Sequence, residues 1–137
     1  SITSFYTVLA DGDDTNDPVV DAARAILDGH IVLSREQAQL GIYPAVDLPA
    51  SISRVAADIS GDAHTAAVRQ FRRLVSIHQE NRDLVMMGGY VQGQDADLDI
   101  AMQLWPSIVN FLKQDDGEPA SFSDSVEALK NLIGGNI

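Results

Sequence analysis

The sequence predicts an α/β part over residues 1–60 followed by an all-α helical domain over residues 61–137, with helix as the main structure. Residues 2–9 are mostly β-branched and aromatic, which is typical of a strand buried on both faces of a parallel sheet. A second short apolar run follows at residues 30–33. From Gly61 onward, apolar residues recur at the three- and four-residue spacing of an amphipathic helix. This change of period separates the two parts.

The α/β part opens directly in its first predicted strand, so we expect the chain to be a piece of a longer protein. Residues 11–18 are predicted to form an acidic, turn-rich loop. Asp17 is a predicted N-cap with Pro18 at the first helical position, which favours a helix over residues 18–27. Gly29 ends this helix before the second strand. The loop lacks a Glu at the position that a calcium-binding loop requires, and we expect no metal site.

A second helix of the α/β part is predicted by its caps. Ser34, with Gln37 three residues later, resembles a capping box for a short helix that ends at Gly41. The stretch from there to Arg54 contains a rigid turn and is otherwise expected to be irregular.

The helical domain is expected to contain three helices. The first runs from about Gly61 to Met87 and ends at a pair of glycines. The second covers roughly residues 95–113 and has Pro106 inside it, where we expect a kink. A last helix begins after Ser121 or Ser123. The predicted inward-facing residues are Ala67, Phe71, Leu74, Val75 and His78 on the first helix, Leu98, Ala101, Met102, Trp105, Ile108, Val109 and Leu112 on the second, and Phe122, Val126, Leu129 and Ile133 on the last.

The composition excludes several classes of function. The formal net charge of -11 disfavours binding to nucleic acid or to anionic lipid, because both require clustered Lys and Arg. The chain has no cysteine, which excludes disulfides and thiolate chemistry and fits a cytoplasmic protein. No apolar run is long enough to cross a bilayer. A short basic stripe, Arg69, Arg72 and Arg73, is expected to be solvated and paired with nearby carboxylates.

Several blocks of the sequence resemble, in order and at suitable spacing, the rotary-type ATPase family. They are residues 1–4, 12–18, 27–35, 43–47 and 51–54. Residues 5–9, 28–30 and 80–84 make the chain most similar to one branch, the flagellum-specific ATPase of the flagellar type III export apparatus. The resemblance covers essentially the whole chain, and ordered blocks are more specific than any single motif.

The resemblance implies a C-terminal fragment: the end of a RecA-like ATPase core and the helical domain that follows it. It implies a cytoplasmic homohexamer, peripheral to the membrane export apparatus, that hydrolyses ATP with Mg²⁺ at subunit interfaces. The phosphate-binding loop with its Lys, the magnesium-binding Asp and the catalytic Glu would precede Ser1. The fragment alone is therefore expected to be inactive and to bind no cofactor.

Arg54 is the candidate catalytic residue. By resemblance it stands where the family has an arginine finger, which reaches the γ-phosphate bound by the neighbouring subunit. A guanidinium is always charged and offers a planar fork of donors to phosphate oxygens. The alternative is a surface arginine on a loop. The local sequence alone favours that alternative, whereas the family blocks around Arg54 favour the finger.

Tyr43 is the candidate nucleotide-binding residue. Pro44 forces Tyr43 into an extended backbone and so fixes the direction of its ring. In related ATPases the aromatic residue at this place packs against adenine. The alternative is a ring that fills the layer beneath the turn, and the sequence does not decide between the two.

Asp95, Asp97 and Asp99 are the candidate partner-binding residues. They lie at the start of the second helix of the helical domain, where carboxylates interact favourably with the helix dipole. That role in capping is one interpretation. In rotary ATPases the corresponding region is acidic and faces a central coiled-coil stalk, so the resemblance implies contact with such a stalk and with other export components.

The sequence leaves two rival functions. Within the family, the nearest rival is the ATPase of a virulence type III secretion system, with the catalytic subunit of a rotary synthase further away. From a different class, the chain can act as a non-catalytic module whose helical domain binds a partner.

Overall fold

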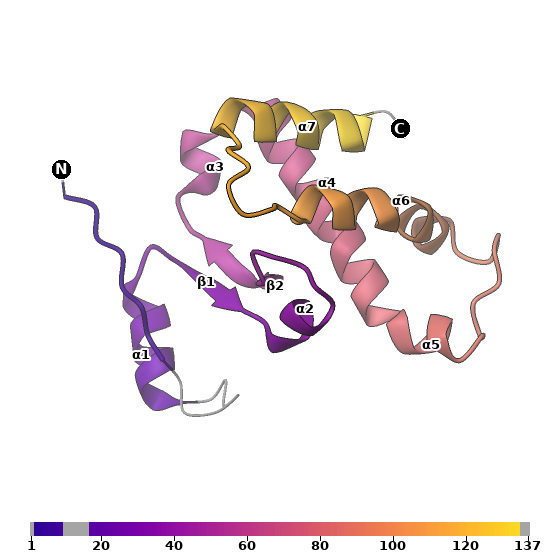
Figure 1. Cartoon of the computed structure of the whole chain (residues 1–137), viewed down its shortest axis with the longest axis horizontal. Helices are drawn as coiled ribbons and strands as arrows, with labels where there is room; N and C mark the ends of the chain where they lie inside the picture. The colour runs from indigo at the N-terminus through magenta and orange to yellow at the C-terminus, as the bar shows by residue number, and fades with distance from the viewer. Residues whose placement is uncertain (1, 10–16, 135–137) are drawn as a thin grey trace.

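The structure is a computed structural model that describes residues 2–9 and 17–134 (Figure 1). Residues 11–16 of the predicted acidic loop lie outside the described residues. The elements in chain order are α1 (Pro18–Ile26), β1 (Gly29–Leu33), α2 (Arg35–Gln39), β2 (Val46–Ser53), α3 (Ala56–Ile59), α4 (Asp62–Glu80), α5 (Arg82–Met86), α6 (Ala96–Leu112) and α7 (Phe122–Gly134). A small sheet near the N-terminal side is thus followed by a helical bundle, and helix predominates, as predicted.

The predicted helix starts are confirmed by their side-chain hydrogen bonds. The Asp17 carboxylate accepts the main-chain N–H of Val19 at 2.7 Å and caps α1. The Ser34 hydroxyl accepts the N–H of Gln37 at 3.3 Å and caps α2. At the start of α7, the Ser121 hydroxyl accepts the main-chain N–H three residues further on at 3.1 Å. Each bond satisfies a donor that the first turn of a helix leaves free.

The two strands form an antiparallel sheet, in which Gly29 faces Ser53 and Leu33 faces Val46. The second apolar run is therefore a strand as expected, but the pairing seen among the described residues is antiparallel rather than parallel. β2 itself was expected to be irregular. It contains Pro49, which has no N–H for a sheet ladder and normally argues against a strand. Pro49 is tolerated because it lies within an irregular stretch of β2, between Asp47 and Ile52, where no ladder pair forms.

Residues 2–9 do not form the predicted strand. They have no regular secondary structure, and their large apolar side chains are exposed, from 46% for Val8 to 95% for Ile2 and Phe5. A strand of a parallel sheet needs neighbours to pair its backbone and helices to cover both faces. The other described residues supply neither for this segment.

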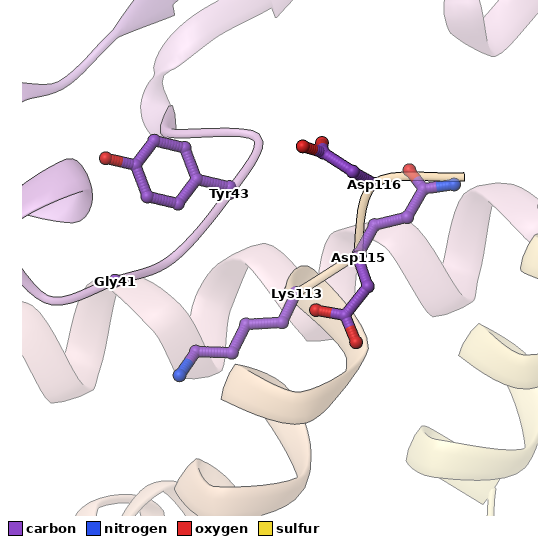
Figure 2. Close-up of a pocket in the computed structure, with 6 residues that line it drawn as sticks. Gly41, Tyr43, Lys113, Asp115 and Asp116 are labelled. Carbon is purple, nitrogen blue, oxygen red and sulfur yellow. The ribbon is translucent and has the colours of Figure 1, made fainter. Parts of the chain in front are cut away.

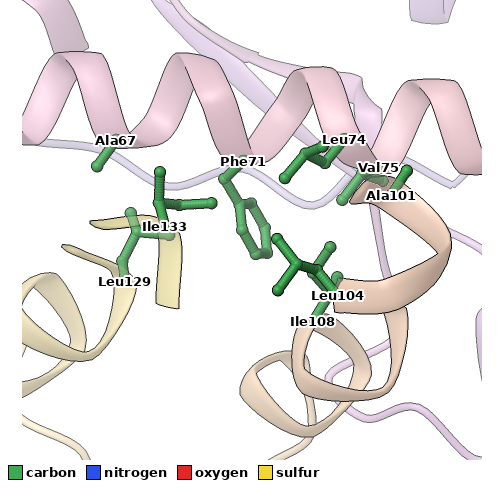
Figure 3. Close-up of a cluster of buried hydrophobic side chains, with 9 residues drawn as sticks. All are labelled: Ala67, Phe71, Leu74, Val75, Ala101, Leu104, Ile108, Leu129 and Ile133. Carbon is green, nitrogen blue, oxygen red and sulfur yellow. The ribbon is translucent and has the colours of Figure 1, made fainter. Parts of the chain in front are cut away.

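The core lies between the three longest helices (Figure 3). It consists of Ala67, Phe71, Leu74 and Val75 on α4, Ala101, Leu104 and Ile108 on α6, and Leu129 and Ile133 on α7. The rings of Phe71 and Phe111 meet edge to face with centroids 5.4 Å apart. Leu48 of β2 packs against this cluster, which ties the sheet to the bundle.

Two details of the predicted helices differ from the structure. The first long helix is interrupted at Asn81, whose side-chain amide donates to the carbonyl of Ile77 at 2.9 Å, and the chain resumes as the short α5. Asn competes well for backbone groups in this way and so favours helix ends. Phe122 was expected to face inward but is 75% exposed, because it is the first residue of α7 and lies at the margin of the core.

Candidate functional site

Arg54 directly follows β2 and is exposed. Its main-chain N–H donates to the carbonyl of Asp28 at 2.8 Å, and its guanidinium donates one hydrogen bond to the carbonyl of Arg24 at 3.2 Å. Arg54 forms no ion pair with any described residue. A guanidinium has five N–H donors, so most of its capacity to bind an anion is unused.

Tyr43 lies before β2, at the opposite end of the strand from Arg54. Its backbone is held by buried Ile42 on one side and by a hydrogen bond from the main-chain N–H of Gln114 to the Tyr43 carbonyl, 2.8 Å long. Tyr43 is 57% exposed, so the other described residues do not bury its ring beneath the turn. The role of Tyr43 in nucleotide binding stays a prediction.

The exposed ring of Tyr43 borders a pocket of about 380 Å³ (Figure 2). The other wall is the segment that follows α6, and the lining residues are Gly41, Tyr43, Lys113, Gln114, Asp115 and Asp116. Figure 2 shows Asp116 and Lys113 extending to the side of this segment on which Gly41 and Tyr43 lie. The Gln114 amide donates to the carbonyl of Glu118 at 2.7 Å and keeps the segment folded.

Sequence reasoning missed the second wall of this pocket. The segment Lys113–Asp116 carries charges and a turn directly after a helix, which is a signal of a surface loop. Nothing in that pattern indicates contact with Tyr43, which lies far away in the sequence. The pocket forms because α6 and β2 both pack on α4, which brings the segment after α6 next to Tyr43.

The three candidate aspartates at the tip of the helical domain each have a partner within the chain. The Asp95 carboxylate caps α6 by accepting the N–H groups of Asp97 at 2.9 Å and Leu98 at 3.1 Å. Asp97 forms an ion pair with Arg73, and both side chains remain about half exposed. The predicted capping role is therefore correct for Asp95, and the predicted pairing of the basic stripe is correct for Arg73.

Asp99 organises the loop before α6. Its carboxylate accepts the hydroxyl proton of Tyr90 at 2.5 Å and the main-chain N–H of Gly93 at 2.8 Å. The hydrogen bond to Asp99 raises the pKa of the Tyr90 hydroxyl, because ionised Tyr90 loses this bond and faces the carboxylate charge. Met86 and Met87 precede this loop in the chain, and their side chains are 74% and 79% exposed.

Arg72 differs from its prediction. It is half-buried and donates to two main-chain carbonyls of β2 rather than to a carboxylate in solvent. The reason is its place on α4, on the side that packs against the sheet. The described residues contain no cluster of side chains that could hold a metal ion, and they contain no helix that is both long and apolar enough to cross a membrane.

Two family models match the chain. The T3SS EscN ATPase C-terminal domain matches residues 60–131, which is more than half of the chain, and the nucleotide-binding domain of the ATP synthase alpha/beta family matches residues 1–53. The flagellum-specific ATP synthase of Salmonella typhimurium is 54% identical over 94% of this chain. The chain spans only 28% of the length of that relative.

Solved structures agree with this match. The assembled ATPase EscN from the enteropathogenic E. coli type III secretion system superposes with a TM-score of 0.91, at 37% identity over 96% of this chain and 32% of its own. A structure of assembled EscN in complex with its central stalk EscO gives a TM-score of 0.79, at 34% identity over 84% of this chain and 28% of its own. The predicted fold class and resemblance are confirmed: the chain belongs to the T3SS EscN ATPase family, with the flagellum-specific ATP synthases among its relatives.

Proposed function

We propose that this chain is the C-terminal part of an ATP-hydrolysing motor for flagellar protein export, in which Arg54 acts as an arginine finger. One observation carries the proposal: Arg54 is exposed at the end of β2 with no anionic partner among the described residues. A guanidinium at a strand end that has no ion-pair partner among the described residues suits an anion supplied by another subunit. In nucleotide hydrolases such a residue contributes ~10³–10⁵ in turnover when provided in trans.

The adenine of ATP fits the pocket beside Tyr43. The volume of this pocket, about 380 Å³, falls within the ~300–1,000 Å³ that is typical of small-molecule sites. Tyr43 offers an exposed ring for stacking, and the backbone of the facing segment is fixed by the bond between Gln114 and Tyr43. The γ-phosphate of bound ATP, with Mg²⁺, supplies the charge that Arg54 of a neighbouring subunit binds. The parts that hold those phosphates and the metal belong, in this proposal, to the parent protein outside these residues.

The parent is proposed to be a cytoplasmic homohexamer with a boundary between its ATPase core and its helical domain near residue 60. The solved relative described as assembled supports self-association. The flagellar branch is favoured over a virulence system because a flagellar relative is 54% identical, whereas the EscN structure is 37% identical.

Exchange of Arg54 in the full-length parent tests the proposed role. Arg54→Ala should leave nucleotide affinity and assembly intact and reduce turnover by about 10³-fold or more. Arg54→Lys is the matched variant, because it keeps the charge and loses the planar fork. Turnover of Arg54→Ala within a few-fold of the parent would remove the finger assignment.

A second proposed function is partner binding by the tip of the helical domain, defined here by Asp95, Asp97 and Asp99. The structure of EscN with its central stalk EscO supports it, as does the half-exposed carboxylate of Asp97. The partner is proposed to be a coiled-coil stalk with a basic face. Titration of such a stalk with Asp97→Asn should show weaker binding at low salt, whereas the control Glu127→Gln, which removes an exposed carboxylate from α7 instead, should bind like the parent. Equal affinity for Asp97→Asn and the parent would exclude Asp97 from the contact.

A further inference from the structure

The strand that leads to Arg54 contains an irregular bulge. His30 of β1 faces Ile52 of β2, and Val32 faces Asp47. Ile31 thus stands alone on β1 opposite the stretch of β2 between Asp47 and Ile52. Extra residues in one strand leave backbone groups unpaired and redirect the strand, and bulges of this kind are frequent beside active sites.

Side chains within the sheet satisfy part of the bulge. The Ser51 hydroxyl donates to the carbonyl of Asp47 at 2.5 Å and accepts the main-chain N–H of Val32 at 2.9 Å. The Asp47 carboxylate accepts the N–H of Ala50 at 2.9 Å, and the carbonyl of Ala50 accepts from the His30 ring at 3.0 Å. The carbonyls of Pro49 and Ser51 have no partner in this set.

Arg72 of α4 binds both of those carbonyls. One guanidinium nitrogen donates to Ser51 at 3.0 Å and the other to Pro49 at 3.3 Å. Hydrogen bonds from a charged donor are stronger than neutral ones, and Arg72 is half-buried, so water competes less for them. A rigid fork that spans two carbonyls fixes both the distance and the direction of the bulge relative to α4.

From these contacts we infer that Arg72 is a positioning residue for Arg54. The inference rests on the proposed role of Arg54 as a finger. Only Ile52 and Ser53 separate the clamped carbonyl of Ser51 from Arg54, and the backbone of Arg54 is in turn bonded to Asp28. Arg72 thereby links the orientation of α4, the central helix of the core, to the direction of the guanidinium.

This link gives Arg72 a role that burial alone does not predict. If α4 tilts relative to the sheet, the bulge follows it through the two hydrogen bonds, and Arg54 moves with the end of β2. Misplacement of a reacting group by about 1 Å can reduce the rate about 10²-fold. The helical domain therefore acts on the phosphate site of the neighbouring subunit through Arg72.

The test compares ground-state and transition-state affinity in the full-length parent. ADP reports the ground state, and ADP with Mg²⁺ and aluminium fluoride mimics the transition state that the finger contacts. Arg72→Ala should reduce turnover and affinity for the aluminium fluoride complex by about 10-fold to 10²-fold while affinity for ADP stays unchanged. Turnover and affinity for the aluminium fluoride complex in Arg72→Lys should lie between those of Arg72→Ala and the parent. One ammonium keeps the charge but cannot bridge both carbonyls in the same way.

Controls separate positioning from a general loss of structure. Arg69→Ala removes an exposed arginine from the same helix and should leave every value unchanged. In the Arg54→Ala background, Arg72→Ala should cause no further loss of affinity for the aluminium fluoride complex. A further loss there, or an equal loss of affinity for ADP and for the complex, would overturn the positioning role.

The two proposals fail in different ways. Normal turnover in Arg54→Ala removes the finger and with it this inference. Collapse of turnover in Arg54→Ala together with normal turnover in Arg72→Ala overturns the positioning role alone.

Discussion

The helical domain and the α/β part differ in where their apolar side chains lie. In the helical domain, α4, α6 and α7 bury one continuous cluster, which includes fully buried Ala101 and Ile108. In the α/β part, large apolar side chains such as Ile26, Ile31 and Ile59 are more than two-thirds exposed. The same part carries both residues proposed to act on nucleotide, Tyr43 and Arg54.

The two parts therefore differ in what stabilises them. The helical domain obtains its stability from its own core, because burial of apolar area is the main favourable term in folding. The described α/β residues have only a two-stranded sheet, which is marginal without further packing. Their shape depends on contacts from the helical domain, such as the clamp by Arg72, the bond from Gln114 to Tyr43 and the ion pair between Arg82 and Glu36.

The largest effect on stability is expected from the core of the helical domain. Phe71→Ala removes a ring that is 4% exposed and contacts Phe111, and it should lower the free energy of unfolding by about 3–5 kcal/mol. The control is Ile59→Ala in the α/β part, at a site that is 79% exposed. This variant should change the free energy of unfolding by less than about 0.5 kcal/mol. Urea unfolding followed by the fluorescence of the single tryptophan, Trp105, measures both. Similar losses for the two variants would contradict the contrast.

The next effect concerns the α/β part and is one of binding rather than stability. Tyr43→Ala in the full-length parent should weaken ATP binding by about 1–3 kcal/mol, the range found for stacking of a base on an aromatic ring. Tyr43→Phe keeps the ring and should bind like the parent. Calorimetric titration distinguishes them, and equal affinity of the Ala and Phe variants would show that the ring does not contact the base.

A smaller effect is expected at the tip of the helical domain. Asp95→Ala removes the N-cap of α6 and should cost about 1 kcal/mol of stability, whereas Asp95→Asn should cost only a few tenths, since Asn also caps well. Thermal unfolding of the two variants provides the comparison. A loss of the same size in both would mean that the charge of Asp95, rather than its cap, stabilises the helix.

The smallest effect is a pH dependence within the bundle. His78 stacks on Trp105 with centroids 3.5 Å apart, and burial lowers the pKa of His78 below its ordinary value of about 6.5. Because the unfolded chain then binds the proton more readily, the stability that His78 contributes is present above pH ~6.5 and is lost as the pH falls below it. The urea midpoint should decrease between pH ~7.5 and ~5.5, and less so in His78→Phe. An unchanged pH dependence in His78→Phe would assign the decrease to other groups.

The sequence predicted the parts of the fold that local signals determine. The caps at Asp17, Ser34 and Ser121 act through residues within one turn, so they were visible without the structure. Longer-range pairings were not visible. Pro49 concealed β2, because a proline is compatible with a strand only where a bulge or an edge removes the need for its N–H.

For the candidate site, the sequence indicated individual residues but not the contacts that surround them. Arg54 and Tyr43 were found through the resemblance, and the structure shows both exposed. The segment Lys113–Asp116 and the clamp by Arg72 were missed, because both depend on contacts between residues that lie far apart in the sequence. The partner-binding role of Asp95, Asp97 and Asp99 stays a prediction.

The central claim, that Arg54 acts on a neighbouring subunit, is tested most directly by mixing two inactive variants of the full-length parent. One variant carries Arg54→Ala and keeps its own phosphate site, and the other keeps Arg54 but lacks the lysine of its phosphate-binding loop. The account predicts that mixed assemblies regain turnover, because an intact site then meets an intact Arg54 across a subunit boundary. Mixed assemblies that form but remain as inactive as either variant alone would contradict it.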